Sequence, residues 1–211
     1  MILIDWLDSL NVHHYVYYII FFYMLRNIYR YFLRPSKNFL KYGDWAVITG
    51  STSGIGKALS YELAKKGLNI VLISRTESKL KEIASDLERL YAIQTRIVSI
   101  DYNDEFNTTK SYNKITKVIQ DIDVAVLVNN VGCSYPFPMY FHELSIDEIN
   151  DLIQMNIHST NHMTRLILPQ IENNKKGGLV VNMGSGSGEF ACPLLSVYSA
   201  SKRYIDQLSL S

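Results

Sequence analysis

The chain is poor in cysteine, with only Cys133 and Cys192 in the whole sequence. The two lie far apart, and neither has histidine neighbours at a spacing that suits a metal ion. The sequence therefore gives no basis for a disulfide framework or for a metal site. Free thiols of this kind fit a reducing compartment that faces the cytosol.

The chain also has little excess charge, because 21 lysines and arginines stand against 20 aspartates and glutamates. No basic cluster interleaved with aromatic residues occurs in the main part of the sequence. We therefore expect no nucleic acid as a partner. With 211 residues, of which 47% are hydrophobic and 19% charged, the chain is long enough and apolar enough to bury a sizeable core.

Formal charge is missing from residues 12–25, an apolar run of 14 residues that is rich in tyrosine and phenylalanine. A bilayer span needs roughly 20 such residues. A secretory signal is not favoured, because no basic region precedes the run and no small-residue cleavage site follows it. Three interpretations stay open: a tilted transmembrane helix, a helix in the membrane interface, and a helix packed on the main domain. Membrane attachment is the favoured one.

Basic residues follow the apolar run on one side only. Arg26, Arg30 and Arg34 recur every four residues, so they form one stripe of a helix. Positive charge after an apolar segment predicts that the following domain faces the cytosol. We expect residues 1–41 to be a membrane anchor with a basic flank and residues 42–211 to be a separate domain.

Beyond residue 41, short runs of β-branched residues alternate with longer helical stretches. We expect strands over residues 45–49, 69–74, 96–100, 124–128 and 178–183. We expect helices over residues 56–66, 77–91, 110–120 and 147–168, and one more at the carboxyl end. Strands without polar alternation indicate a parallel sheet covered on both faces. The predicted fold class is therefore α/β, with a Rossmann-type doubly wound parallel sheet.

The first predicted strand runs into a turn rich in glycine and serine, Thr49-Gly50-Ser51-Thr52-Ser53-Gly54-Ile55-Gly56, which opens the first helix. Glycines there permit a tight turn and let backbone N–H groups approach a pyrophosphate at the helix N-terminus. The position between a strand and a helix makes this indication much stronger than a lone glycine-rich loop. An ordinary turn capped by serines is the alternative. The candidate cofactor-binding residues of the turn are Gly50, Ser51, Ser53, Gly54, Ile55 and Gly56.

The ends of the next strands carry further cofactor candidates. Arg75 stands where an acidic residue would bind the ribose of NAD, so it suits the extra phosphate of NADP(H); a solvated arginine is the alternative. Asp101 either accepts a hydrogen bond from the adenine amino group or forms a turn. Asn129 ends the fourth strand, where an asparagine can tie strand ends together and line the cofactor cleft.

A hydroxyl, a phenol and an ammonium come near the end of the sequence, at Ser185, Tyr198 and Lys202. Lys202 lies four residues after Tyr198, so the two share one face of a helix. The ammonium stabilises the phenolate form, which lets tyrosine exchange a proton nearer neutral pH. The hydroxyl of Ser185 can hold a substrate carbonyl oxygen as negative charge develops during hydride attack. A Tyr-x-x-x-Lys pair alone is usually a solvated helix face, so the prediction depends on the surrounding motifs.

These motifs together resemble the short-chain dehydrogenase/reductase superfamily over roughly residues 44–211. The resemblance implies that Tyr198 is the proton donor and that Lys202 binds the nicotinamide ribose and tunes Tyr198. It also implies that Ser185 orients the substrate carbonyl and that Asn156 supports a water-mediated proton relay. The matching residues are Gly50, Gly54, Gly56, Asp101, Asn129, Asn130, Gly132, Asn156, Ser185, Tyr198 and Lys202.

A narrower resemblance is to the membrane-bound 17β-hydroxysteroid dehydrogenase and very-long-chain 3-oxoacyl-CoA reductase group, in which serine is common where Gly184 stands. It implies NADPH as the cofactor and a keto group on a lipid as the substrate, either a 3-oxoacyl-CoA or a 17-ketosteroid. It also implies a membrane segment in the endoplasmic reticulum, with the catalytic domain facing the cytosol. The long helices are candidates for a homodimer contact. The segments that carry the resemblance are residues 45–50, 72–75, 126–135, 184–188 and 193–195.

The sequence departs from this group in length, because it stops at Ser211. Members of the family continue into two more strands, a substrate-covering loop and a segment that touches the nicotinamide. We therefore expect a sheet truncated after its fifth strand, in a fragment or in a weak catalyst. Two alternatives stay open: a non-catalytic NADP-binding or scaffold protein at the membrane, and an unstable product with no function.

Overall fold

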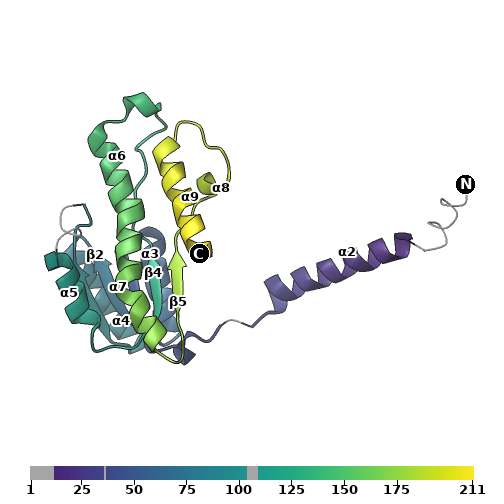
Figure 1. Cartoon of the computed structure of the whole chain (residues 1–211). Coiled ribbons are helices and arrows are strands. Elements are labelled where there is room, and N and C mark those ends of the chain that lie inside the picture. Colours follow the sequence, from purple (N-terminus) through teal and green to yellow (C-terminus); the bar gives the residue numbers. More distant parts are fainter. Residues whose placement is uncertain (1–11, 36, 104–108) are drawn as a thin grey trace, which may run out of the picture. The chain divides into compact units, whose positions relative to one another are not determined.

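Five parallel strands form one sheet in the order β3-β2-β1-β4-β5 (Figure 1). The computed structural model describes residues 12–35, 37–103 and 109–211. Each predicted strand is present within one residue of its expected bounds, which confirms the predicted parallel α/β sheet. The strands are β1 (Trp45–Thr49), β2 (Asn69–Ser74), β3 (Thr95–Ser99), β4 (Val124–Asn129) and β5 (Leu179–Asn182).

Helices connect the strands. The α-helices are α3 (Gly54–Lys65), α4 (Glu77–Tyr91), α5 (Thr109–Ile119), α6 (Ile146–Ile153), α7 (Ser159–Asn173), α8 (Gly186–Glu189) and α9 (Ser196–Leu210). Short 3-10 turns are η2 (Phe39–Lys41) and η3 (Phe141–Glu143), and η4 (Gln154–His158) is a π-helical turn. Crossovers of this kind are what a parallel sheet requires, since neighbouring parallel strands cannot be joined by a hairpin.

The sheet is buried on both faces, because successive residues of a strand point to opposite sides. Val47 lies in a buried cluster with residues of the neighbouring strands, with Ile115 of α5 and with Ile167 of α7. Ile48 faces the other way, in the cluster that includes Leu63 of α3 and Leu80 of α4. A fully buried side chain of this size contributes about 1.5–3 kcal/mol, so the two clusters hold the strand ends, and the side chains that follow them, in fixed positions.

The turn after α3 shows how the sequence sets a helix end. Gly67 has a φ of 89°, which favours glycine. Its N–H donates to the carbonyl of Ala64 at 2.8 Å, and the N–H of Leu68 donates to that of Leu63 at 3.2 Å. This is a Schellman cap, and it confirms the predicted glycine stop before β2.

The long helical stretch after β4 differs from the prediction in two ways. Its predicted end at Leu168 is wrong, because α7 continues through Pro169 to Asn173. Ile167 and Ile171, one turn apart, are both buried in the core, and this packing outweighs the cost of one missing backbone hydrogen bond. The π-helical turn η4 between α6 and α7 was not predicted either.

The chain divides into two compact units, Met1–Asn38 and Phe39–Ser211. In the first, α2 (Val12–Ile28) leads into the π-helical turn η1 (Tyr29–Leu33). The large apolar side chains between Tyr15 and Leu25 are 43% or more exposed. Among the helices in the described part of the chain, none is both long enough and apolar enough to cross a membrane.

Candidate active site

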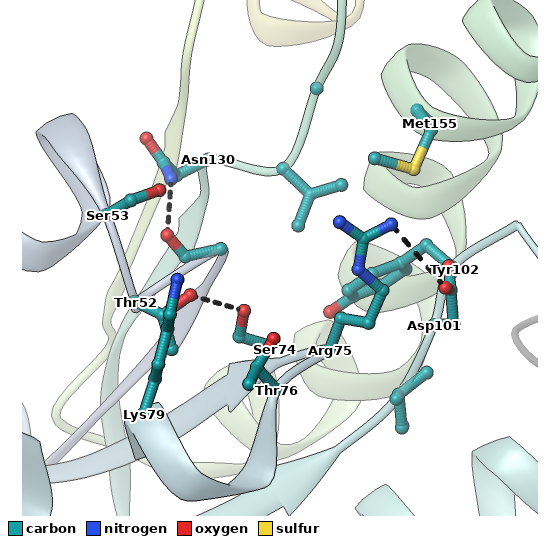
Figure 2. A pocket seen from close by; sticks show the side chains of 14 residues that line it. Thr52, Ser53, Ser74, Arg75, Thr76, Lys79, Asp101, Tyr102, Asn130 and Met155 are labelled. Atoms are coloured by element: carbon teal, nitrogen blue, oxygen red, sulfur yellow. Dashed lines mark hydrogen bonds and ion pairs between the residues drawn. The ribbon is translucent and has the colours of Figure 1, made fainter. Parts of the chain in front are cut away.

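A cavity of about 340 Å³ opens where β1, β2 and β4 end (Figure 2). β1 lies between β2 and β4 in the sheet, so the strand order reverses at this point. Crevices at such a switch point, at the carboxyl edge of an open α/β sheet, are where ligands bind. The cavity is therefore the candidate ligand site.

The glycine-rich turn forms one wall of the cavity, and its glycines are required by close packing. Gly50 has a φ of 64°, and a Cβ there would lie 2.9 Å from Nδ2 of Asn130. A Cβ on Gly56 would collide with the carbonyl oxygen of Gly50 and with the same Nδ2. Asn130 Nδ2 donates to the carbonyls of Thr49 at 3.1 Å and Gly50 at 3.2 Å. The turn is therefore held against the end of β4, and side chains at Gly50 and Gly56 would push the two apart.

Cations and hydroxyls gather at the end of the cavity beside β2, as Figure 2 shows. Arg75 lies there with its side chain 77% exposed, and its Nη1 is 3.7 Å from Oδ2 of Asp101. Thr52 Oγ1 and Ser74 Oγ share a hydrogen bond of 2.7 Å. Lys79, which also lines the cavity, was not proposed from the sequence.

The position of Lys79 was a usable signal. It lies in the first turn of α4, where the helix dipole disfavours a cation. A lysine at that place is better explained by an anion nearby than by helix stability.

Several predicted residues take structural positions instead. The side chain of Ser51 is fully buried and its hydroxyl donates to the carbonyl of Ile73 at 3.4 Å. Asn129 Nδ2 donates to Thr164 Oγ1 at 3.0 Å and to Asn182 Oδ1 at 2.8 Å. Asn129 therefore ties β4 to β5 and α7, as expected of a strand-end asparagine, but its side chain does not line this cavity. Ile55, in the first turn of α3, is 59% exposed.

Tyr198 and Lys202 lie one turn apart on α9, as the spacing predicts. Nζ of Lys202 is 5.8 Å from the centre of the Tyr198 ring and donates to the carbonyl of Met183 at 2.9 Å. Lys202 is only 7% exposed. Burial lowers the pKa of its ammonium, while the charges of Asp206 and Cys133 act to raise the pKa. The structure therefore sets an ammonium beside a phenol in a largely desolvated position.

Asn156 is brought to the same place by the π-helical turn η4. Its Nδ2 donates to the carbonyl of Cys133 at 2.9 Å and to Ser201 Oγ at 3.0 Å, and its Oδ1 accepts from the N–H of Cys133 at 2.8 Å. A Cβ on Gly132 would lie 2.7 Å from that Oδ1 and 3.5 Å from Nζ of Lys202. π-helical turns are frequent at functional sites, and here one turns a buried asparagine toward α9.

Ser185 follows β5 and caps the short helix α8. Its Oγ accepts hydrogen bonds from the N–H of Ser187 at 3.3 Å and from Ser187 Oγ at 3.0 Å. α8 packs against α9, so the loop that carries Ser185 lies on the helix that carries Tyr198 and Lys202. The hydroxyl, phenol and ammonium thus come from two neighbouring segments.

The family model of the short chain dehydrogenases matches residues 44–211. The chain belongs to the short chain dehydrogenase family. It is 44% identical over 169 residues to "Inactive hydroxysteroid dehydrogenase-like protein 1" of Homo sapiens, covering 80% of this chain and 50% of that protein. It is 43% identical over 169 residues to "Very-long-chain 3-oxoacyl-CoA reductase" of Rattus norvegicus, covering 79% of this chain and 53% of that protein. This short chain dehydrogenase therefore spans about half the length of the curated relatives it matches, and the resemblance to their group is confirmed.

Solved structures share the fold of this short chain dehydrogenase. A short-chain dehydrogenase from Sphingobium yanoikuyae in complex with NADPH matches with a TM-score of 0.71 at 23% identity, covering 79% of this chain and 62% of that one. An alcohol dehydrogenase from Thermococcus sibiricus complexed with 5-hydroxy-NADP matches with a TM-score of 0.70 at 25% identity, covering 78% and 68%. These likenesses agree with the observed order of strands.

The cavity residues fit a phosphorylated dinucleotide. Gly50 and Gly56 allow the turn to pack tightly against Asn130 at the start of α3, the place where a pyrophosphate meets the helix N-terminus in this type of fold. Arg75 and Lys79 suit a further phosphate. No cluster of histidine, cysteine, aspartate or glutamate that could hold a metal ion occurs in residues 12–35, 37–103 or 109–211.

Proposed function

We propose that this short chain dehydrogenase is an NADPH-dependent reductase of a keto group on a lipid, with Tyr198 as the proton donor. The observation that carries the proposal is the placement of Lys202, a residue that is 7% exposed and whose Nζ lies 5.8 Å from the centre of the Tyr198 ring, beside the loop of Ser185. The names of the relatives favour two substrate classes, 3-oxoacyl-CoA thioesters and ketosteroids.

The residues divide the work of the reduction. Lys202 would hold the nicotinamide ribose, and the nicotinamide, when bound, would supply a hydride to the carbonyl carbon. Ser185 donates a hydrogen bond to the carbonyl oxygen, and the hydroxyl of Tyr198 gives that oxygen its proton, so the keto group becomes a hydroxyl. The ammonium of Lys202 stabilises the phenolate left behind. Asn156 supports the return of a proton from water.

Arg75 is proposed to select NADPH over NADH. Arg75→Asp should weaken NADPH binding by about 10–100-fold, because a charge-assisted hydrogen bond contributes about 1.5–3 kcal/mol, and should leave NADH binding unchanged or tighter. Fluorescence titration with both cofactors measures this. Arg89→Asp is the matched control, because Arg89 lies on α4 and pairs with Asp86, outside the residues that line the cavity. Unchanged NADPH binding in Arg75→Asp would refute the proposed role of Arg75. So would a wild type that binds NADH more tightly than NADPH.

We also propose that the first unit attaches the chain to the cytosolic face of the endoplasmic reticulum membrane. The exposed aromatic and aliphatic side chains of α2 and η1 support this, since tyrosine and arginine both suit the membrane interface. Arg26 lies over the Tyr23 ring, with 5.2 Å from Cζ to the ring centre, and Arg30 lies 5.9 Å from the Tyr31 ring.

Flotation of the full chain with vesicles of phosphatidylcholine and phosphatidylserine tests the attachment. The double substitution Phe21→Asp and Phe22→Asp should reduce the floated fraction at least about tenfold, because it places two charges in the apolar surface. Phe190→Asp is the control, since Phe190 is 78% exposed in the second unit. Equal flotation of the wild type and the double variant would contradict membrane attachment.

A homodimer through the long helices stays a proposal as well. An apolar cleft of about 430 Å³ between α6 and α9 supports it. Ile153, Ile157, Val197 and Tyr204 are among the residues that line the cleft.

A second candidate function is a non-catalytic NADP-binding or scaffold protein at the membrane. It is favoured by the 44% identity to a relative whose name calls it inactive. The two candidates separate in one assay, in which NADPH binding is measured alongside turnover of a panel of carbonyl compounds. Binding without turnover of any carbonyl supports the second candidate.

A further inference from the structure

Asp206 lies on α9 one turn after Lys202, with its carboxylate against the loop that carries Ser185. A Cβ on Gly184 would lie 2.7 Å from Oδ1 of Asp206, and a Cβ on Gly188 would lie 2.6 Å from Oδ2. The two glycines therefore bracket Ser185 and leave the space that the carboxylate occupies. Within the described part of the chain, Oδ2 is buried and has no hydrogen-bond partner.

A buried carboxylate oxygen without a partner is costly for folding. A buried carboxylate at this position is explained if its negative charge stabilises a neighbouring positive charge. Residues four apart share a helix face, which places the carboxylate on the Lys202 side of α9. The ammonium of Lys202 is itself bonded to the carbonyl of Met183, the residue before Gly184. Asp206, Lys202 and the start of the Ser185 loop therefore form one connected unit.

We propose that Asp206 is a positioning residue of the active site, which fills the space between the Ser185 loop and α9 and keeps the ammonium of Lys202 charged. The proposal rests on the function proposed above for Ser185 and Lys202. Without Asp206, a buried ammonium would lose the main negative charge near it.

The other groups around Lys202 do not supply the negative charge that Asp206 supplies. Tyr198 is on α9 itself, and Cys133 comes from the loop after β4 and is half-buried, with the pKa of its thiol raised by burial. Glu189 of α8 lies 3.6 Å from Arg203. Of the charges that raise the pKa of Lys202 against the effect of its burial, that of Asp206 acts most strongly.

The first test is a titration of Lys202 in the full chain. Lysine labelled with carbon-13 at Cε reports the protonation of each side chain by NMR, and Lys202→Arg identifies the resonance. Asp206→Asn keeps the shape of the side chain and removes its charge. We expect the pKa of Lys202 to fall in this variant, because removal of the carboxylate charge leaves the effect of burial less opposed. An unchanged pKa would overturn the proposal. This readout needs no turnover, so it is independent of whether the chain reduces a carbonyl.

The second test begins with substitutions that leave Asp206 in place, and it does not depend on the folding of Asp206→Asn. Gly184→Ala puts a methyl group against Oδ1, whereas Gly186→Ala has no atom within 4 Å of its new Cβ. We expect Gly184→Ala to lower the melting temperature, because the carboxylate of Asp206 must move, and Gly186→Ala to leave it nearly unchanged. Adding Asp206→Ala should relieve Gly184→Ala, because no other heavy atom than those of Asp206 stands within 4 Å of that Cβ.

The matched control for the double variant is Gly188→Ala. Its Cβ would also lie 3.0 Å from the backbone N of Arg203 and 3.0 Å from the backbone C of Lys202, so Asp206→Ala should not relieve it. Equal melting temperatures for Gly184→Ala and Gly186→Ala, or relief of both glycine variants by Asp206→Ala, would count against the proposal. Where the chain reduces a carbonyl substrate, the alkaline limb of the pH profile of kcat/KM should also move to lower pH in Asp206→Asn.

Discussion

Tyr198→Phe is expected to lower the rate of NADPH-dependent carbonyl reduction by about 10²–10⁴-fold, the usual contribution of a positioned general acid. The substitution removes one oxygen from a half-buried ring and leaves the stem of Lys202 and the loop of Ser185 untouched. NADPH binding and the melting temperature should therefore stay close to those of the wild type. The measurement is consumption of NADPH with a long-chain 3-oxoacyl-CoA and with a 17-ketosteroid.

Tyr204→Phe is the matched control for this experiment. Tyr204 lies on the same helix, and its hydroxyl exchanges hydrogen bonds with the side chain of Asn161, at 2.9 Å and 3.2 Å. Its loss should change the rate less than about threefold, since it contacts none of the predicted catalytic residues in these hydrogen bonds. Equal rates for the wild type and Tyr198→Phe would contradict the role of Tyr198 as proton donor.

Gly56→Ala is expected to abolish NADPH binding and to lower the free energy of unfolding by about 1–3 kcal/mol, the cost of overpacking a tight site. The new Cβ would collide with the carbonyl oxygen of Gly50 and with Nδ2 of Asn130. Either the turn opens or Asn130 withdraws from the carbonyls of Thr49 and Gly50, and in both cases the wall of the cavity changes shape. Cofactor titration and urea unfolding measure the two effects.

Gly54→Ala separates this collision from backbone strain. Gly54 has a φ of 52° and no heavy atom within 4 Å of a new Cβ, so its substitution costs only the left-handed conformation, about 1–2 kcal/mol. NADPH binding should then survive in Gly54→Ala and fail in Gly56→Ala. Full binding by Gly56→Ala would contradict the role given to the turn.

The sheet was predictable because its signals are local. Each strand is a short run of β-branched and aliphatic residues between turns, the pattern typical of a strand that is covered on both faces. The glycine after α3 likewise has only one efficient use at a helix end. These features depend on a few neighbouring residues, which a sequence displays directly.

The predictions that were wrong concern features that depend on contacts between residues far apart in the sequence. Pro169 stays within a helix because Ile167 and Ile171 are both buried in the core. Ser51 and Ser53 look alike in the glycine-rich turn, yet only Ser53 lines the cavity while Ser51 turns inward to Ile73. The backbone conformation of the turn decides which serine side chain points into the cavity, and the sequence alone does not show that conformation.

Tyr198 and Lys202 were predicted as candidate catalytic residues by type and spacing, and Asn156 from the family resemblance, but the contacts that support them were not predicted. Tyr198 and Lys202 are four apart on a helix, so their proximity follows from helix geometry. The approach of Asn156 depends on a π-helical turn, and the burial of Asp206 depends on Gly184 and Gly188. Lys79 could have been found from its unfavourable place in the first turn of α4.

The most direct test of the proposed reduction follows the hydride itself. The full chain is incubated with NADPH deuterated at C4 of the nicotinamide and with each substrate class in turn, and the products are examined by mass spectrometry. We expect one deuterium on the carbon that carried the keto group, in at least one of the two classes. Bound NADPH with no deuterated hydroxyl product from either class would contradict it.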